Sequence, residues 1–200
     1  MIRYPNGKTF VENKEPTTSK KKRTIHNAAN RGMSFESDIN ASNEFYSENH
    51  RALITKRPTP INIVKVDYSH GARITDAYFE AQSTTDYNGV YRGRYLDFEA
   101  KSCHGKTSFP LSNITSHQIK HLEGVISHGG IAFFLISLVH LDEVYLLDAS
   151  YVIEAYKKKE RKSIPFEDIK ENGHIVKQGY LPRLLYLDVV DEVYFHEKNI

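Results

Sequence analysis

The feature that most limits the possible folds is an almost continuous apolar run over residues 131–139, Ile-Ala-Phe-Phe-Leu-Ile-Ser-Leu-Val. Crossing a membrane as a helix takes about 18 apolar residues, so this run is too short to span one. Its length suits a strand, and a strand that is apolar along both sides has to be covered on both faces of its sheet. The run therefore predicts a buried strand inside a sheet.

Apolar spacing and turn residues place the other elements. We expect helices over residues 34–48, 115–127 and 151–159, with Ser34 as the N-cap of the first and Thr115 or Ser116 as that of the second. We expect strands over residues 52–56, 61–66, 75–83, 94–101 and 144–147, a turn at Asn88-Gly89, and a strand or a helix over residues 184–190. This order predicts an α/β domain with a mixed sheet and flanking helices.

A projecting hairpin is expected over residues 57–83. The prolines of Arg57-Pro58-Thr59-Pro60 separate two strands, and residues 68–72 supply a turn between the second of them and a returning strand. Lys65 and Arg73 would lie on this hairpin. We therefore predict one domain over residues 31–200, with a stalk at about residues 57–83.

The formal net charge of +2 hides an uneven distribution. Residues 1–31 hold eight Lys or Arg against two Asp or Glu, whereas residues 32–200 hold nineteen against twenty-three. Residues 6–30 are also poor in apolar side chains, so we interpret residues 1–30 as a mobile basic arm that either keeps the chain in solution or binds phosphates. Residues 51–120 hold ten basic and six acidic side chains, a surplus that a polyanion partner favours.

Other features narrow the class of protein. A single cysteine, Cys103, excludes an intramolecular disulfide and suits a reducing compartment. The first residues contain no apolar signal core, so we expect a cytoplasmic protein that makes no membrane contact. The glycine-rich motifs of nucleotide-binding sites are missing from the sequence.

Candidate catalytic residues lie on and before the strand over residues 94–101. Glu99 and Lys101 are two residues apart and so share one face of that strand, and Asp86 lies thirteen positions before Glu99. Two acids and a lysine suit metal-dependent phosphodiester hydrolysis, because oxygen ligands hold Mg²⁺ and the cation activates a water. Lys101 would position this water or stabilise the charge of the transition state.

A simpler alternative is a surface strand whose outer face is merely charged. Three neighbouring features favour catalysis. Asp97 adds an acid on the same face, although it could serve structure only. Arg92 and Arg94 place cations where phosphates would approach, and Gln118 offers a neutral oxygen ligand.

Two other groups are weaker candidates. His117 and His121 are four residues apart on one predicted helix and could ligate zinc, but no further ligands complete a site, so a solvated helix face suits them better. Cys103 beside His104 could act as a nucleophile, but the local sequence supplies no third group to orient the base.

Several segments of the sequence form a set of motifs that is typical of one protein family. They are residues 1–8, 30–33 with Glu36, 56–60, 83–91, 93–101, 106–111 and 117–121; residues 93–101, for example, read Gly-Arg-Tyr-Leu-Asp-Phe-Glu-Ala-Lys. They resemble the RecU family of Holliday junction resolvases from Gram-positive bacteria. The similarity covers essentially the whole chain, more strongly up to about residue 121. Ser102-Cys103-His104 depart from the family pattern, in which Glu-Thr is expected after the lysine.

The resemblance implies a restriction-endonuclease-like α/β fold, dependence on Mg²⁺ or Mn²⁺, and paired nicks in a four-way DNA junction. Asp86, Glu99 and Gln118 match the family's metal ligands, and Thr84 contributes at the same centre. Lys101 matches the residue that stabilises the transition state. The resemblance therefore implies a metal-dependent active site at these five residues.

The resemblance also implies DNA contacts and partners. Glu36 resembles an additional acid near the metal, and Phe79 would lie near the base of a stalk that enters the centre of the junction. The implied DNA-binding residues are Arg31, Lys56, Arg57, Lys65, Arg73, Phe79, Arg92 and Arg94. A homodimer is implied, which the two symmetric cuts favour independently, together with the recombinase RecA and the branch-migration motor RuvB as partners.

The leading hypothesis is therefore a Mg²⁺-dependent endonuclease that resolves Holliday junctions in homologous recombination and DNA repair. Two alternatives stay open. The first is a non-catalytic architectural protein that bridges DNA strands, and the second is a restriction-type endonuclease of the same fold that cuts linear duplex.

Overall fold

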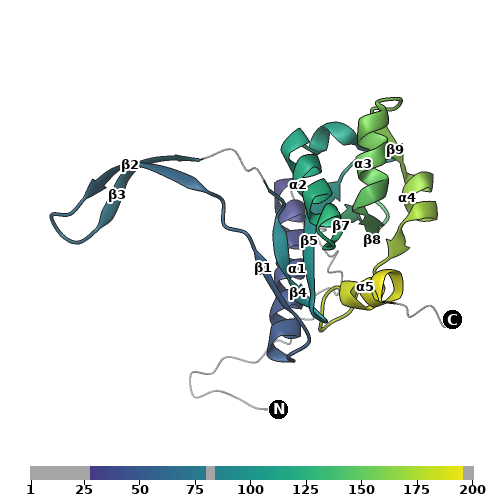
Figure 1. The fold of residues 1–200 in the computed structure, drawn as a ribbon, viewed down its shortest axis with the longest axis horizontal. Coiled ribbons are helices and arrows are strands. Elements are labelled where there is room, and N and C mark those ends of the chain that lie inside the picture. The colour runs from purple at the N-terminus through teal and green to yellow at the C-terminus, as the bar shows by residue number, and fades with distance from the viewer. Residues whose placement is uncertain (1–27, 80–83, 196–200) are drawn as a thin grey trace, which may run out of the picture.

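A mixed sheet forms the centre of the molecule. The computed structural model describes residues 28–79 and 84–195. Within these residues, six strands lie in the order β1-β4-β5-β7-β8-β10 (Figure 1). They are β1 Leu53–Lys56, β4 Tyr87–Tyr91, β5 Arg94–Cys103, β7 Ile131–Leu138, β8 Glu143–Asp148 and β10 His174–Ile175. Strands β5 and β7 are parallel and the other neighbours antiparallel, which confirms the predicted mixed α/β class.

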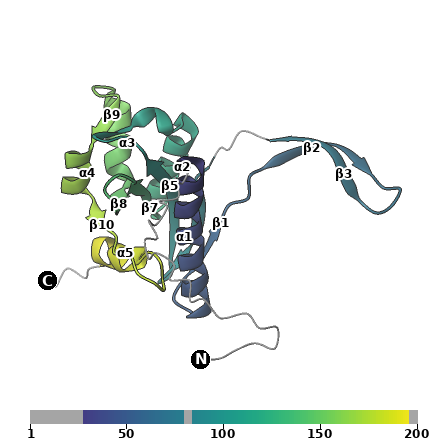
Figure 2. The ribbon, with the colours of Figure 1, turned by 180° about the vertical axis from the view of Figure 1, so that it is seen from behind.

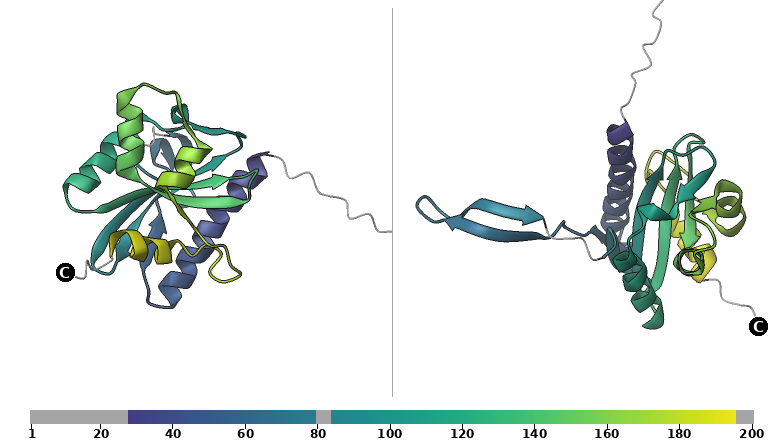
Figure 3. Two further views of the ribbon diagram at one scale, coloured as in Figure 1. Left: turned by 90° about the vertical axis from the view of Figure 1, so that its right-hand side faces the viewer. Right: turned by 90° about the horizontal axis from the view of Figure 1, so that it is seen from above.

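Helices cover both faces of this sheet, as Figure 3 shows. On one face lie α1 (Ala28–Glu48) and α5 (Tyr186–Tyr194). On the other lie α2 (Ser116–Ser127), α3 (Ala149–Lys158) and α4 (Phe166–Asn172). From behind, α1 is seen along β1 and β5 (Figure 2). None of the helices in the described segments is long and apolar enough to cross a membrane.

Strand β7 separates two hydrophobic cores. Phe133 and Leu135 enter the core on the α1 and α5 face, whereas Phe134 and Ile136 enter the core under α2, α3 and α4. All four side chains are fully buried, and such burial is worth about 1.5–3 kcal/mol for each of them. The structure confirms that the run over residues 131–139 is a strand covered on both faces, although β7 ends at Leu138.

A separate hairpin projects from this body. Strands β2 (Ile61–Asp67) and β3 (Arg73–Phe79) pair antiparallel with each other, from Ile61 opposite Phe79 to Asp67 opposite Arg73. Most of their side chains are exposed, because the described part of the hairpin contributes to neither core. We call residues 61–79 the stalk (Figures 1 and 3). Residues 80–83 of the predicted returning strand lie outside the described residues.

The predicted turn at Asn88-Gly89 is wrong. Both residues lie inside β4, and the β4–β5 turn is made by Arg92 and Gly93, with φ of 48° and 74°. Gly89 is needed for another reason, since a Cβ there would lie 2.1 Å from the carbonyl oxygen of Leu53 in β1. Asn-Gly is a strong turn signal, but this glycine serves the close approach of two strands.

The N-terminal boundary of α1 also differs from the prediction. The helix begins at Ala28, so Ser34 is not its N-cap, and residues 28–30 are helical rather than part of the arm. Apolar spacing detects the part of a helix that packs against a core, and Phe35 and Ile39 of α1 belong to that core. Residues 1–27 of the predicted arm lie outside the described residues.

The other predicted elements fit more closely. Thr115 caps α2 through a capping box with Gln118, which confirms the first of the two predicted caps. Residues 184–190, left open between strand and helix, contain the start of α5. The pattern missed the short elements β6 (Ser108–Pro110), η1 (Leu111–Asn113), β9 (Ser163–Pro165), α4 and β10.

The close approach at Gly89 gives a stability prediction. Gly89→Ala should destabilise the fold by about 1–3 kcal/mol, because the new methyl group overlaps the backbone of β1. Gly124→Ala in α2 is the matched control: its Cβ meets no heavy atom within 4 Å, and alanine should add about 0.5–1 kcal/mol as the better helix former. Urea unfolding midpoints measure both effects. Equal midpoints for wild type and Gly89→Ala would show that β1 leaves room for a side chain at position 89.

Candidate active site

The two acids of β5 point into the protein. Asp97 and Glu99 face α2, and they are 0% and 1% exposed. Leu96 and Phe98 enter the core on the opposite face, as alternation along a strand requires. Burying an ionisable carboxyl is costly unless it is paired, so a face that is merely charged and solvated is excluded as an explanation.

Glu99 is the centre of one polar cluster. Its Oε1 lies 2.7 Å from Lys101 Nζ and accepts a hydrogen bond of 2.5 Å from Gln118 Nε2. Its Oε2 accepts a bond of 3.2 Å from the backbone N–H of Asp86, whose own Oδ2 accepts from the N–H of Ala100 at 3.2 Å. The structure thus brings together Asp86, Glu99, Lys101 and Gln118 from the start of β4, from β5 and from α2.

The electrostatics of this cluster favour a bound cation. Burial, and then the charge of Asp86, raise the pKa of Glu99 to about 8, whereas Lys101 lowers it. Glu99 therefore lies beside the negative charge of Asp86 and the positive charge of Lys101. A divalent cation would remove this conflict, and carboxylate oxygens are the ligands that Mg²⁺ prefers. Within the described residues, no three His, Cys, Asp or Glu side chains gather into a group that could hold a metal ion.

Gln118 contacts Glu99, whereas Thr84 lines a groove. The Oε1 of Gln118 accepts from the N–H of Thr115 in the capping box, so its amide nitrogen is the atom that faces Glu99. The amide of Gln118 therefore orients Glu99, and its oxygen, predicted to be a metal ligand, is bonded to Thr115 instead. Thr84, half-buried, lines an open groove of about 720 Å³ together with Tyr95, His117, Lys120, His121, Gly124, Val125, His128 and Gly130.

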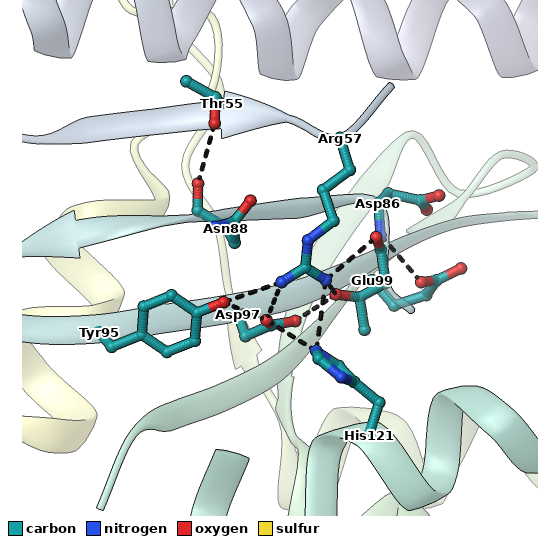
Figure 4. Close-up of polar contacts among 9 residues, drawn as sticks. Thr55, Arg57, Asp86, Asn88, Tyr95, Asp97, Glu99 and His121 are labelled. Carbon is teal, nitrogen blue, oxygen red and sulfur yellow. Dashed lines mark hydrogen bonds and ion pairs between the residues drawn. The ribbon is translucent and has the colours of Figure 1, made fainter. Parts of the chain in front are cut away.

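Arg57 is turned into the protein (Figure 4). Its guanidinium lies 2.6 Å from Asp97 Oδ2, and its side chain is 18% exposed. Arg57 was predicted to contact DNA, but its charge is paired with the buried carboxylate of Asp97. The sequence marks Asp97 as an extra acid, but it gives no signal that Arg57 is its partner.

Glu36, predicted to lie near the metal, forms an ion pair with Lys56, which was predicted to contact DNA. Glu36 on α1 lies 2.5 Å from Lys56 Nζ at the end of β1, and both side chains are nearly half exposed. Glu36 is not among the residues that contact Glu99. Its position makes it a neighbour of the entry to the stalk.

The remaining predicted DNA-binding residues lie on the surface. Arg92 pairs with Asp191 at 2.9 Å, and Arg94 donates to the carbonyl of Gly129 at 2.7 Å. On the stalk, Lys65, Arg73 and Phe79 are exposed, Phe79 by 78%. Arg31 lies in α1, and its side chain is outside what the structure describes.

Comparison with known proteins decides the family. The family model "RecU: Recombination protein U" matches residues 30–192. The chain belongs to the RecU family. A RecU relative from Geobacillus kaustophilus (strain HTA426), named Holliday junction resolvase RecU, is 51% identical over 199 residues, covering 97% of this chain and 98% of the relative.

Two further RecU relatives carry the same name. The protein from Bacillus cytotoxicus is 47% identical over 199 residues, with 97% of this chain and 98% of the relative covered. The protein from Geobacillus sp. (strain WCH70) is 49% identical over 201 residues, with 98% of each chain covered. The resemblance found in the sequence motifs is confirmed over nearly the whole chain.

The raised pKa of Glu99 gives a pH prediction. Its folded value of about 8 lies above its ordinary value of 4.5, so the contribution of Glu99 to stability is complete below pH 4.5 and is lost as the pH rises through 8. Asp86→Asn removes a charge that raises this pKa while keeping an acceptor for the N–H of Ala100. The variant should therefore lose less stability than wild type between about pH 5 and about pH 8.5.

Thermal unfolding in EDTA measures the difference. Lowering the pKa of Glu99 by one is worth about 1.4 kcal/mol, or about 3–6 °C in melting temperature. Glu160→Gln, at an exposed position, is the control and should follow wild type. The same loss of stability in wild type and Asp86→Asn would show that the two carboxyls do not interact.

Proposed function

We propose that this protein is a Mg²⁺-dependent endonuclease that resolves four-way DNA junctions by paired nicks. The observation that carries the proposal is the contact of Asp86, Glu99 and Lys101 inside one cluster. The names of the relatives supply the substrate, since they are called Holliday junction resolvases. Mn²⁺ should substitute for Mg²⁺, because it also accepts oxygen ligands.

The residues of the cluster would divide the chemistry. Asp86 and Glu99 would hold the cation, which when bound supplies a water of lowered pKa and neutralises charge on the phosphate. Gln118 fixes the orientation of Glu99 through its amide. Lys101 is 23% exposed at its side chain, so its ammonium can approach the phosphate and stabilise the negative charge that develops there.

The surroundings of the cluster suit branched DNA. The groove beside Thr84 carries Lys120 and His117, both exposed, together with Tyr95 and His121, which contact Asp97. The stalk projects from the same region and exposes Ile63, Tyr78 and Phe79, which are side chains able to stack or pack against bases. A duplex would occupy the groove, and the stalk would enter the centre of the junction.

Two copies of the chain would act together. A four-way junction has two-fold symmetry and needs two cuts, whereas one chain offers one cluster of Asp86, Glu99 and Lys101. A homodimer related by a two-fold axis supplies two such clusters in matching orientation.

The catalytic proposal is tested by comparing a four-way junction with a linear duplex of the same sequence in Mg²⁺. Wild type should nick the junction and spare the duplex. Asp86→Asn and Lys101→Ala should each lower the cleavage rate by about 100-fold or more, because each removes a charge needed in the transition state, while junction binding in EDTA stays nearly unchanged. Lys170→Ala, in a surface ion pair on α4, is the control.

Three outcomes would contradict the proposal. Full cleavage by either active-site variant would remove the assigned roles. No cleavage of any branched substrate by wild type, even in Mn²⁺, would favour the architectural protein. Equal cleavage of duplex and junction would favour the restriction-type enzyme.

The basic segment at the N-terminus gives a separate prediction. Replacing Lys20, Lys21 and Lys22 by glutamine should weaken junction binding and flatten its salt dependence, by about 0.9 in the log–log slope for each phosphate that is no longer neutralised. Replacing Lys157, Lys158 and Lys159 at the end of α3 removes the same charge elsewhere and should leave the slope nearly unchanged. Titrations of labelled junction over a range of salt concentrations measure both slopes, and equal slopes in the two variants would assign the N-terminal lysines to solubility.

A further inference from the structure

The chain segments on either side of the stalk, which we call its ends, reach the same buried carboxylate. The chain leaves the body at Arg57, directly after β1, and returns to it at Thr85, directly before Asp86. Arg57 and Thr85 both contact Asp97, which is 0% exposed on β5. Asp97 is therefore the point at which the outgoing and the returning chain meet (Figure 4).

The outgoing chain is held through the side chain of Arg57. Arg57 donates from its NH2 nitrogen to Asp97 Oδ2 at 2.6 Å and to the hydroxyl of Tyr95 at 2.8 Å. Its NH1 nitrogen donates to the hydroxyl of Thr85 at 2.7 Å. The planar guanidinium thus bridges β5 and the returning chain, which a lysine could not do with the same geometry.

The hydroxyl of Thr85 links the returning chain to both Arg57 and Asp97. Thr85 is fully buried, and its Oγ1 accepts from Arg57 while donating to Asp97 Oδ1. His121 on α2 adds a contact from the other side, with its Nε2 2.9 Å from Asp97 Oδ2. Each oxygen of the buried carboxylate therefore has a donor, as a charge in the interior requires.

This network is continuous with the metal ligands assigned above. The backbone N–H of Arg57 donates to the carbonyl of Asp86 at 2.8 Å, and the N–H of Asp86 in turn donates to Glu99 Oε2 at 3.2 Å. Asp97 lies two residues before Glu99 on the same face of β5. Asp86 is hydrogen-bonded to Arg57 and follows Thr85 directly in the chain, so a displacement of either end of the stalk would also displace Asp86.

We propose that Asp97, Arg57 and Thr85 form a clamp that fixes both ends of the stalk against β5 and thereby positions Asp86 relative to Glu99. The proposal rests on the endonuclease function proposed above. The three are positioning residues, since none of them needs to touch the reacting phosphate. Through this clamp, docking of the stalk in a junction sets the geometry of the catalytic cluster.

Stability alone is a poor reason for such a network. A buried ion pair adds little free energy over apolar side chains of similar volume, and its geometry is what distinguishes it. The stalk strands pair with each other and, within the described residues, with no strand of the central sheet. The orientation of a hairpin held in this way depends on the few residues at its ends, and misplacing a catalytic group by about 1 Å can cost about 100-fold in rate.

The experiment compares two substitutions at one position. Thr85→Val keeps the shape of the side chain but removes the hydroxyl that joins Arg57 to Asp97, whereas Thr85→Ser keeps the hydroxyl. Thr55→Val is the matched control, because Thr55 on β1 is exposed and its hydroxyl donates to the carbonyl of Asn88 at 3.5 Å, away from Asp97. Single-turnover junction cleavage, its Mg²⁺ dependence and junction binding in EDTA are measured for all three and for wild type.

We expect Thr85→Val to lower the cleavage rate by about 10- to 100-fold and to raise the Mg²⁺ concentration for half-maximal rate, with binding within about twofold of wild type. Thr85→Ser and Thr55→Val should cleave within about threefold of wild type. A circular dichroism melt shows that each variant is folded at the assay temperature.

Several results would overturn the clamp. They are cleavage by Thr85→Val at the wild-type rate, an equal loss in Thr85→Ser, and a loss of binding that accounts for the whole loss of cleavage. Failure of wild type to cut any junction would instead overturn the proposed function, so the two proposals fail in different measurements.

Discussion

The need to satisfy two buried carboxylates governs the arrangement around β5. The strand places Asp97 and Glu99 under α2, where each must have donors. Glu99 finds them in Lys101, Gln118 and the backbone of Asp86, and Asp97 finds them in residues from the ends of the stalk and from α2. One polar face thus joins the sheet, a helix and the hairpin, and it holds Asp86 beside Glu99.

The body and the stalk are stabilised in different ways. The body has two apolar cores separated by β7, so its strands and helices are fixed by packing on both faces. The stalk has exposed side chains on both strands and belongs to neither core in the described residues. Its orientation is therefore set at its ends, where Arg57 and Thr85 meet Asp97. The connection proposed between the stalk and the cluster around Glu99 therefore runs through polar rather than apolar contacts.

Much of the fold follows from local pattern. The apolar run over residues 131–139, the alternation of β5 and the cap at Thr115 each predict their element, because each reports burial or hydrogen bonding within a few residues. The errors have physical causes. Gly89 is required by the neighbouring strand rather than by a turn, and the first turns of α1 precede the apolar stripe that reveals the helix. Short elements such as β9 pair with distant segments, so no local periodicity marks them.

The sequence by itself determined which chemical groups are available. It places a glutamate and a lysine two residues apart on one strand and an aspartate before the preceding strand. It also places two prolines before a hairpin. The tertiary structure decided which of these groups meet. Arg57 lies 40 positions from Asp97 and His121 lies 24 positions from it, and only the packing of β1, β5 and α2 brings them into contact. The burial of Asp97 and Glu99 also depends on α2 covering β5, and burial is the first cause of the raised pKa of Glu99, followed by the charge of Asp86.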